Sequence, residues 1–341
     1  MKYWIPASVA ALAATELTLR TFGFGTPVLS QTDTETGYRF QPNQKINRFG
    51  KNIEYNQYSQ RSEPITPEKP QRKIRILMTG DSVLNGGNPT DQSNIITELF
   101  ENKLTKSNHP AEVLNASAGS WGIGNQQGYL RKFGTFNSNA VILQIGTHDL
   151  LQPTSTGEKI GKSPNAPTQA PLLGLQEAVT RYALPKVTKI LKLNSPPAEI
   201  PQLKQTNQQF QQNIESLKAI INQIRKQNIP VFVLFTPNRE DLLPTFQTPE
   251  YKTQFIQLLN SLQVPVIDTH TAWEKLPTTT VKTYFRDGVH LSVTGNQAAA
   301  NLLYEKLCVE KELVVCSDVE STTDRNRLIQ KATTASNSSY H

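Results

Sequence analysis

Short apolar runs alternate with amphipathic stretches through most of the chain. Turn residues bound each run, as expected for buried strands, and the runs lie at 74–80, 113–115, 140–145, 231–235 and 264–267. Apolar positions at helical spacing predict helices at 95–104, 126–133, 202–227, 251–262 and from Ser292 or Thr294 to 307. Strands that alternate with helices predict an α/β fold, a three-layer α/β/α sandwich around a five-stranded parallel sheet.

The segments outside this alternation have a different composition. The stretch before Lys73 is rich in Pro, Asn, Gln, Tyr and Arg, which predicts an arm with short strands wrapped on the main domain or leading into it. A Pro-, Thr- and Gly-rich insertion, with a possible helix at 175–193 broken at Pro185, is typical of a lid or binding loop. We predict an N-terminal segment 1–25, an arm 26–72, a main domain 73–316 with the insertion 151–200, and a disordered tail 317–341.

The first residues of the chain allow two interpretations. Lys2 precedes an apolar stretch, 3–14, that is too short to span a bilayer but fits a signal-peptide core with a cleavage site at Ala11–Ala13. Residues 6–24 could instead form one amphipathic helix. Export to the cell envelope, or peripheral membrane attachment through the N-terminus, is therefore favoured over a cytoplasmic location.

The composition of the chain limits the kinds of partner that the protein is expected to bind. The net charge is +7, but Lys and Arg are scattered without a long run, which favours a solvated basic surface over a nucleic-acid site. The mean hydropathy of −0.45 excludes a protein with many membrane spans. The two cysteines, Cys308 and Cys316, do not form a zinc motif, so a local disulfide and two free thiols both stay open.

Two blocks carry residues suited to nucleophilic catalysis. Gly80-Asp81-Ser82 ends the first strand, where a serine hydroxyl would be exposed at a strand-to-helix turn, although such a triplet also makes ordinary turns. Asp287 and His290 lie three positions apart before the last helix. The carboxylate could hold the imidazole Nδ1–H and leave Nε2 free to take a proton; the alternative is a capping Asp and a surface His.

Polar or small residues also end the second and third strands, at Asn115–Gly122 and Gly146–Asp149. Taken alone, each of these blocks is ordinary turn chemistry. The carboxyl ends of parallel strands meet at one edge of the sheet, however, so we expect both blocks to lie beside Ser82.

Together the four blocks resemble the SGNH (GDSL-like) hydrolase family over roughly 73–307. The resemblance implies a flavodoxin-like sheet, Ser82 as the nucleophile, and Asp287 with His290 as its activating pair. It also implies an oxyanion hole formed by the backbone N–H groups of Ser82 and Ser120 and by His148. Ser120 stands where the family has a glycine and His148 where it has an asparagine; a neutral imidazole N–H can donate as an amide does.

The implied function is hydrolysis of an ester, either a short-chain acyl ester or an O-acetylated carbohydrate, through an acyl-Ser82 intermediate. Two alternatives are a polysaccharide O-acetyltransferase and an inactive SGNH-like module that binds carbohydrate. Asp268 and His270 form a rival pair similar to that of SGNH-like O-acetyltransferases, but Leu291, Ser292 and Gly295 fit the family better around His290. No cofactor or metal is predicted, because no phosphate-binding or metal-ligand motif occurs.

Overall fold

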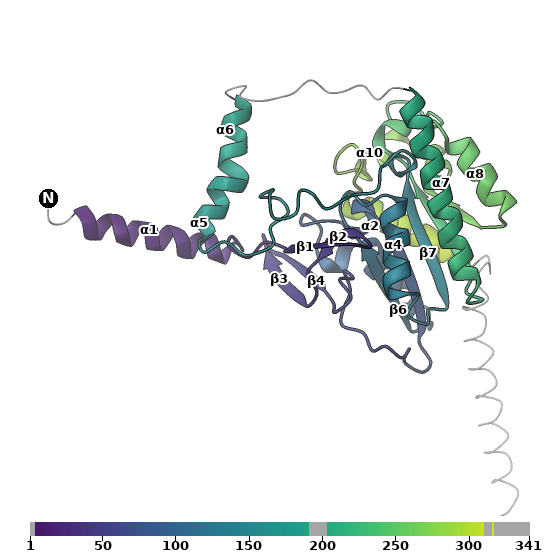
Figure 1. Ribbon diagram of the computed structural model, residues 1–341, viewed down its shortest axis with the longest axis horizontal. Coiled ribbons are helices and arrows are strands. Elements are labelled where there is room, and N and C mark those ends of the chain that lie inside the picture. Colours follow the sequence, from purple (N-terminus) through teal and green to yellow (C-terminus); the bar gives the residue numbers. More distant parts are fainter. Residues whose placement is uncertain (1–3, 191–202, 310–315, 317–341) are drawn as a thin grey trace, which may run out of the picture.

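A five-stranded parallel sheet forms the centre of the molecule (Figure 1). The computed structural model describes residues 4–190, 203–309 and 316. The strand order is β6-β5-β7-β8-β9, and every neighbouring pair is parallel, which confirms the predicted fold class. The strands are β5 Ile74–Gly80, β6 Ala111–Ser117, β7 Ala140–Gly146, β8 Val231–Thr236 and β9 Val266–Asp268.

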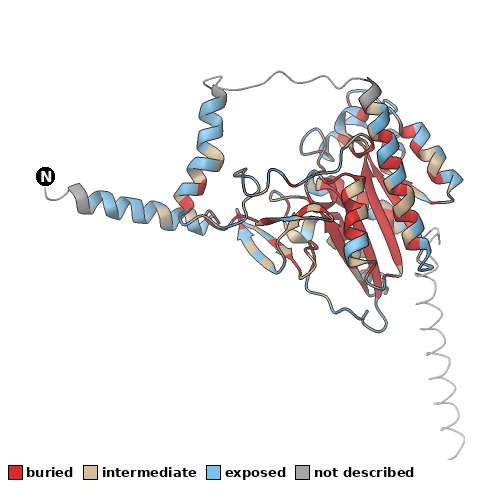
Figure 2. Ribbon diagram, viewed as in Figure 1, coloured by how far each residue is buried: buried red, intermediate tan, exposed pale blue. Residues whose placement is uncertain are grey.

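Helices cover both faces of this sheet, and the three central strands are entirely buried (Figure 2). On one face α3 and α11 pack against each other, and their apolar side chains share a core with Ile76 and Met78. On the other face α4 and α7 enclose a second core around Leu77 and Val141. Alternate residues of β5 thus point into opposite cores, as strand geometry requires.

The predicted helices are present with small shifts at their ends. The last begins directly after Ser292, whose hydroxyl accepts the N–H of Gly295 as an N-cap. The helices of the main domain are α2 Ser82–Asn85, α3 Ile96–Lys106, α4 Ile123–Phe133, α7 Leu203–Arg225, α8 Lys252–Ser261, α9 Thr269–Glu274, α10 Thr278–Thr283 and α11 Val293–Tyr304, with shorter turns η1 Gln92–Asn94, η2 His148–Leu150, η4 Arg239–Asp241 and η5 Glu305–Val309.

Two antiparallel hairpins precede the sheet, β1 (Ser30–Asp33) with β2 (Gly37–Phe40) and β3 (Gln44–Arg48) with β4 (Lys51–Tyr55). Side chains bind this arm to the main domain. The indole Nε1–H of Trp121 donates to the Tyr38 carbonyl at 2.9 Å, and the buried Arg61 guanidinium donates to the carbonyls of Asn85, Gly87 and Thr90. The arm therefore lies close to the turn after β5 that carries Ser82.

Within the insertion, residues 174–190 form a continuous helical segment made of α5 (Gly174–Glu177), the π-helical turn η3 (Ala178–Ala183) and α6 (Leu184–Ile190). The expected break at Pro185 is wrong. Proline lacks an N–H and its ring crowds the carbonyl four residues earlier, and the wider π turn directly before it fits that missing bond. The predicted end of this helix, residues 191–193, lies outside the described residues.

One helix, α1 (Trp4–Thr21), occupies the N-terminal segment and projects away from the sheet (Figure 1). Within the described ranges, none of the helices has the length and apolar character needed to cross a bilayer. At the other end, Cys308 and Cys316 form a disulfide, which settles the alternative that the sequence left open. The predicted tail 317–341 lies outside the described residues.

Candidate active site

Ser82 lies at the sharp turn between β5 and α2. It is the first residue of α2, so its own N–H has no partner within the helix. Asp81 is the N-cap, and its Oδ1 accepts the N–H of Val83 at 2.8 Å. Gly86 ends the helix after one turn in the left-handed conformation, with φ of 76°. The half-buried serine hydroxyl is thus held at the carboxyl edge of the sheet.

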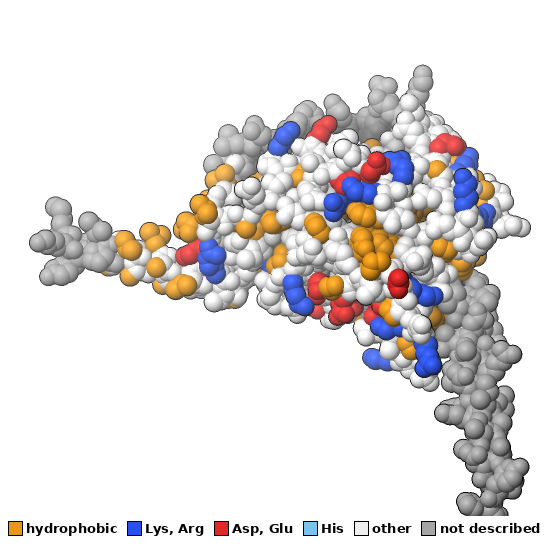
Figure 3. Space-filling view, turned by 60° about the horizontal axis from the view of Figure 1, so that its bottom comes forward, with side chains coloured by type: hydrophobic (Ala, Val, Ile, Leu, Met, Phe, Trp, Pro, Cys, Tyr) orange, Lys and Arg blue, Asp and Glu red, His pale blue; other side chains and the backbone are white. Residues whose placement is uncertain are grey.

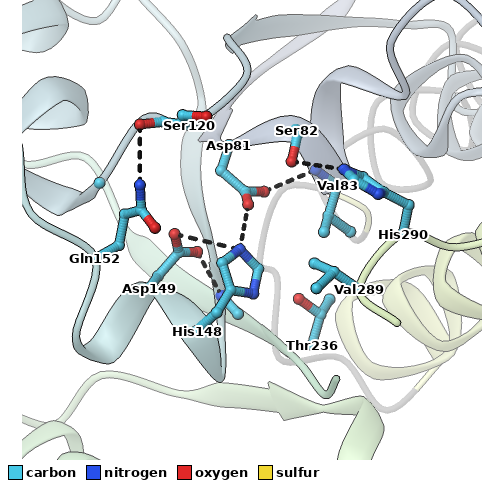
Figure 4. A network of polar contacts seen from close by, with 12 residues as sticks. Asp81, Ser82, Val83, Ser120, His148, Asp149, Gln152, Thr236, Val289 and His290 are labelled. Atoms are coloured by element: carbon cyan, nitrogen blue, oxygen red, sulfur yellow. Dashed lines mark hydrogen bonds and ion pairs between the residues drawn. The ribbon is translucent and has the colours of Figure 1, made fainter. Parts of the chain in front are cut away.

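The loop before α11 brings an imidazole to this hydroxyl (Figure 4). His290 Nε2 lies 2.9 Å from Ser82 Oγ, although the two residues are 208 positions apart. His290 Nδ1 lies 2.8 Å from Asp287 Oδ2, and Asp287 Oδ1 accepts the backbone N–H groups of Val289 and His290. Ser82, His290 and Asp287 therefore form one hydrogen-bonded chain.

Asp287 is ionised at neutral pH. Burial would raise its pKa, but the N–H groups of His290 and Val289, together with the His290 ring, lower it to about 2. The Asp287 side chain is 47% exposed and that of His290 is 31% exposed. The carboxylate is thus placed to keep the Nδ1 proton on His290, while water reaches the pair from outside.

The rival pair lies elsewhere. Asp268 is the N-cap of α9 and lies 2.7 Å from Lys252 Nζ. His270 is buried, its Nδ1 lies 2.7 Å from the same ammonium group, and its ring stacks on Phe246. Burial, aided by the positive charge of Lys252, lowers the pKa of His270. A neutral imidazole enclosed in this way packs the start of α9, and Ser82 is paired with His290 instead.

Ser120, the predicted second oxyanion donor, follows β6 in a strained turn. Its φ is +58°, a left-handed conformation that glycine adopts more readily. Its carbonyl accepts from Gln152 Nε2 at 3.3 Å, and the two residues lie on the far side of Asp81 from His290 (Figure 4). The preceding carbonyl, of Gly119, accepts the hydroxyl of Tyr38 from the arm. The donor role of Ser120 stays a prediction.

His148 is bound through both ring nitrogens. Nε2 lies 2.6 Å from Asp81 Oδ2, and Nδ1 lies 3.1 Å from Asn238 Oδ1. The Asn238 side chain also accepts the backbone N–H of Asp241, which fixes its oxygen as an acceptor. Both ring nitrogens therefore donate, and His148 is an imidazolium. This differs from the neutral donor expected from the sequence, and a role in the oxyanion hole stays a prediction.

Electrostatics agree with this protonation. Burial would lower the pKa of His148, but the charge of Asp149 and the bonds to Asp81 and Asn238 raise it to about 10. Asp149 is fully buried, and this burial together with the neighbouring Asp81 raises its pKa. The Asp149 Oδ2 accepts the N–H of Gly146 at 2.7 Å. The site thus holds a positive charge between two carboxyl groups, directly beside the Ser82 turn.

Three groups here could also ligate a metal ion. One ligand atom from each of Asp81, His148 and Asp149 lies within 4.8 Å of the others. The sequence indicated no such cluster, because its members come from two separate strand ends. Two of these ligand atoms, His148 Nε2 and Asp81 Oδ2, are already joined by a hydrogen bond. That bond accounts for the short distance between the two side chains without a metal ion. The absence of a metal stays a prediction.

Sequence reasoning missed the side chains beneath the site. Gln144, in the middle of β7, accepts the N–H of Asp81 at 3.1 Å and donates to Thr236 Oγ1 at 3.0 Å. Asn238 holds His148 from the loop after β8. A glutamine inside an otherwise apolar strand was the available signal, since a buried amide needs partners.

The fold and these contacts define an α/β protein with a serine, histidine and aspartate gathered at the carboxyl edge of a parallel sheet. The GDSL-like Lipase/Acylhydrolase family model matches residues 78–298. The chain belongs to this family, in agreement with the resemblance of the four blocks, and the family supports a hydrolase or an acyltransferase. No curated protein matches the chain in sequence.

Solved structures of lipolytic and esterase proteins match this chain with low sequence identity and low TM-scores. The lipase/acylhydrolase from Enterococcus faecalis is 15% identical, with 69% of this chain and 95% of that chain covered and a TM-score of 0.40. A member of the lipolytic protein G-D-S-L family from Veillonella parvula is 13% identical. The match covers 68% of this chain and 97% of that chain, with a TM-score of 0.39. A carbohydrate acetylesterase family member from Sinorhizobium meliloti is 9% identical. The match covers 69% of this chain and 98% of that chain, with a TM-score of 0.35. The family assignment rests on the family model alone.

Proposed function

We propose that this protein hydrolyses a carboxylic ester through an acyl-Ser82 intermediate. The observation that carries the proposal is the continuous chain from Ser82 Oγ through His290 to Asp287. In the first step, His290 Nε2 takes the Ser82 proton while Oγ attacks the ester carbonyl carbon. The leaving alcohol then receives that proton as the carbon–oxygen bond breaks.

Water completes the cycle. His290 takes a proton from a water molecule, whose oxygen attacks the acyl carbon, and the proton returns to Ser82 Oγ as the acid leaves. Asp287 keeps the Nδ1 proton on the ring in both steps and stabilises the imidazolium. The exposure of the Asp287 and His290 side chains supports water as the acceptor, because solvent reaches the base directly.

Developing negative charge on the carbonyl oxygen needs donors. The N–H of Ser82, free of any intrahelical bond, is the first. The N–H of Ser120 and the ring of His148 complete the proposed oxyanion hole, and His148 would have to turn from Asp81 to donate there. A short-chain acyl group or an acetylated carbohydrate is the proposed substrate class.

Labelling with a fluorophosphonate probe tests the nucleophile. The full chain is treated with the probe, digested, and the modified residue is mapped by mass spectrometry; a single adduct on Ser82 is expected. Ser82→Ala should lose both the adduct and cleavage of short p-nitrophenyl esters. Ser93→Ala is the matched control, because that hydroxyl only bonds Asp91 in an exposed turn, and it should behave as wild type.

Two results would contradict the proposal. An adduct on another residue would reassign the nucleophile. Efficient labelling of Ser82 without turnover of any ester would exclude hydrolysis and leave a transferase, whose acyl group goes to a sugar hydroxyl. Absence of both labelling and turnover would favour an inactive carbohydrate-binding module.

A further inference from the structure

Large apolar side chains are exposed mainly in one part of the molecule. We call residues 4–29, 44–51 and 172–190 the N-terminal lobe; it joins α1, the β3–β4 turn and the α5–α6 segment. Outside it, among described residues, only Phe246, Val293 and Val309 are exposed large hydrophobics. Within it, the exposed ones are Val9, Leu12, Leu17, Phe22, Phe49, Leu172, Leu173, Val179, Leu184 and Val187.

The carboxylates of the lobe are directed inward. Arg48, with no exposed side-chain surface, pairs with Glu177, which is 5% exposed. Glu16 accepts the N–H groups of Gly174 and Leu175 at 2.7 and 2.9 Å, which fastens α1 to the start of α5. Meanwhile Leu172 is 87% exposed and Leu17 is 67% exposed. This distribution is the reverse of that in an ordinary water-facing surface.

The lobe is also well packed. The rings of Phe24, Phe49 and Tyr182 meet edge to face, with centroids 5.0 to 6.0 Å apart. The Arg48 guanidinium lies over the Phe49 ring at 4.5 Å. The exposed leucines of the lobe therefore belong to segments that are packed together by contacts distant in sequence. Their exposure follows from the folded structure of the lobe.

The charges left on the outside of the lobe are positive. Glu16 and Glu177 are its two carboxylates, and both are bound internally. Lys186 is exposed. Arg20 is 44% exposed although Glu16 lies 2.7 Å from its Nε, and Lys45 is 83% exposed although Glu54 lies 3.3 Å from its Nζ. An apolar surface with cations and without exposed carboxylates is complementary to anionic phospholipid.

We propose that the N-terminal lobe binds the surface of an anionic lipid bilayer, with α1 and the α5–α6 segment lying in the headgroup region. Hydrophobic side chains line α1 where it projects from the body (Figure 3). The proposed contact is interfacial, because exposed apolar side chains and exposed cations occur together in the lobe. Leucines enter the acyl boundary, and the cations meet lipid phosphates.

Vesicle flotation tests this contact. The full chain is mixed with vesicles of pure phosphatidylcholine, or with about one-third phosphatidylglycerol, at low and high salt. Flotation is expected with the anionic vesicles and should weaken with salt, because exposed charges are screened. Leu17→Gln with Leu172→Gln should lower the partition coefficient about tenfold or more, and Lys186→Glu should lower it mainly at low salt.

Val309→Gln is the matched control, since Val309 is 62% exposed but lies outside the lobe; it should float as wild type. Ester cleavage of a soluble substrate should be unchanged in all variants, which separates this proposal from the catalytic one. Equal flotation of the leucine variant and wild type would overturn the proposal, as would no flotation at all. Concentration-dependent self-association in lipid-free buffer, lost in the leucine variant, would assign the surface to a second copy instead.

Discussion

His148 Nε2 lies 2.6 Å from Asp81 Oδ2 and so joins the third strand end to the nucleophile turn. The other nitrogen of the ring contacts Asn238, and the next residue, Arg239, donates its N–H to the carbonyl of Gly288 at 2.8 Å. This path links Asp81, beside Ser82, to the loop that carries His290. A charged histidine thus bridges the two halves of the proposed catalytic apparatus.

Replacement His148→Asn should remove the charge while keeping a donor toward Asp81. The folded-state pKa of His148 is raised from 6.5 to about 10, so its stabilising effect is fully present below pH 6.5 and declines up to pH 10. Wild type should therefore unfold at higher urea concentration than the variant at pH 6, with the gap closing toward pH 10. A gap that stays constant across this range would show that His148 contributes no charge.

Replacement Asp287→Asn should lower kcat/KM by roughly two to four orders of magnitude, because an amide no longer holds the required tautomer of His290. Ester cleavage at neutral pH measures this. Glu274→Gln, at an exposed carboxylate of α9, is the control and should leave the rate unchanged. A rate for the Asp287 variant within a few fold of wild type would remove Asp287 from the mechanism.

Wild type and the Asp287→Asn variant should also differ in how their stability changes at acidic pH. The pKa of Asp287 is lowered from 3.8 to about 2 in the folded state, so its contribution to stability is present above pH 3.8 and is lost as pH falls toward 2. The difference in midpoint of unfolding between wild type and Asp287→Asn should shrink over that interval. A difference that grows as the pH falls would contradict the assigned sign.

Replacement Gly80→Ala should destabilise the nucleophile turn. A Cβ at this position would lie 2.4 Å from Gln144 Oε1 and 2.9 Å from Leu84 Cβ. Since Gln144 accepts the N–H of Asp81, its displacement should cost about 1–3 kcal/mol in unfolding free energy and also reduce activity. Gly288→Ala, which meets nothing within 4 Å, is the control for stability. Equal stability of the two variants would refute this explanation of Gly80.

Replacement Arg61→Met should loosen the loop after α2. The guanidinium donates to the carbonyls of Asn85, Gly87 and Thr90, which would lose these partners. Unfolding in urea should show a loss of at least about 2 kcal/mol. Arg131→Gln breaks an exposed ion pair with Glu35 and should change stability little. Similar losses in both variants would argue against a special role for the arm.

Hydrophobic periodicity determined the sheet, because buried strands and amphipathic helices impose different spacings on the chain. It also located the ends of the strands, and therefore Ser82. The Asp287–His290 pair was visible for a similar reason: three residues of loop suffice to bring the carboxylate to the ring, so the contact is local in sequence. The arm's short strands followed from its turn-rich composition.

Other contacts depend on how distant segments pack. Ser82 and His290 meet across 208 positions, and this packing places His290 beside the serine while His270 is buried elsewhere. The charge of His148 depends on Asp81 and Asn238, which arrive from different strand ends. Likewise, Arg48 and Glu177 join the arm to the insertion across 129 positions. The spacing of residues within one helix, strand or loop fixes its local geometry. The protonation of a side chain and its partners from other elements depend on burial and on neighbouring charges, which exist only once the chain is folded.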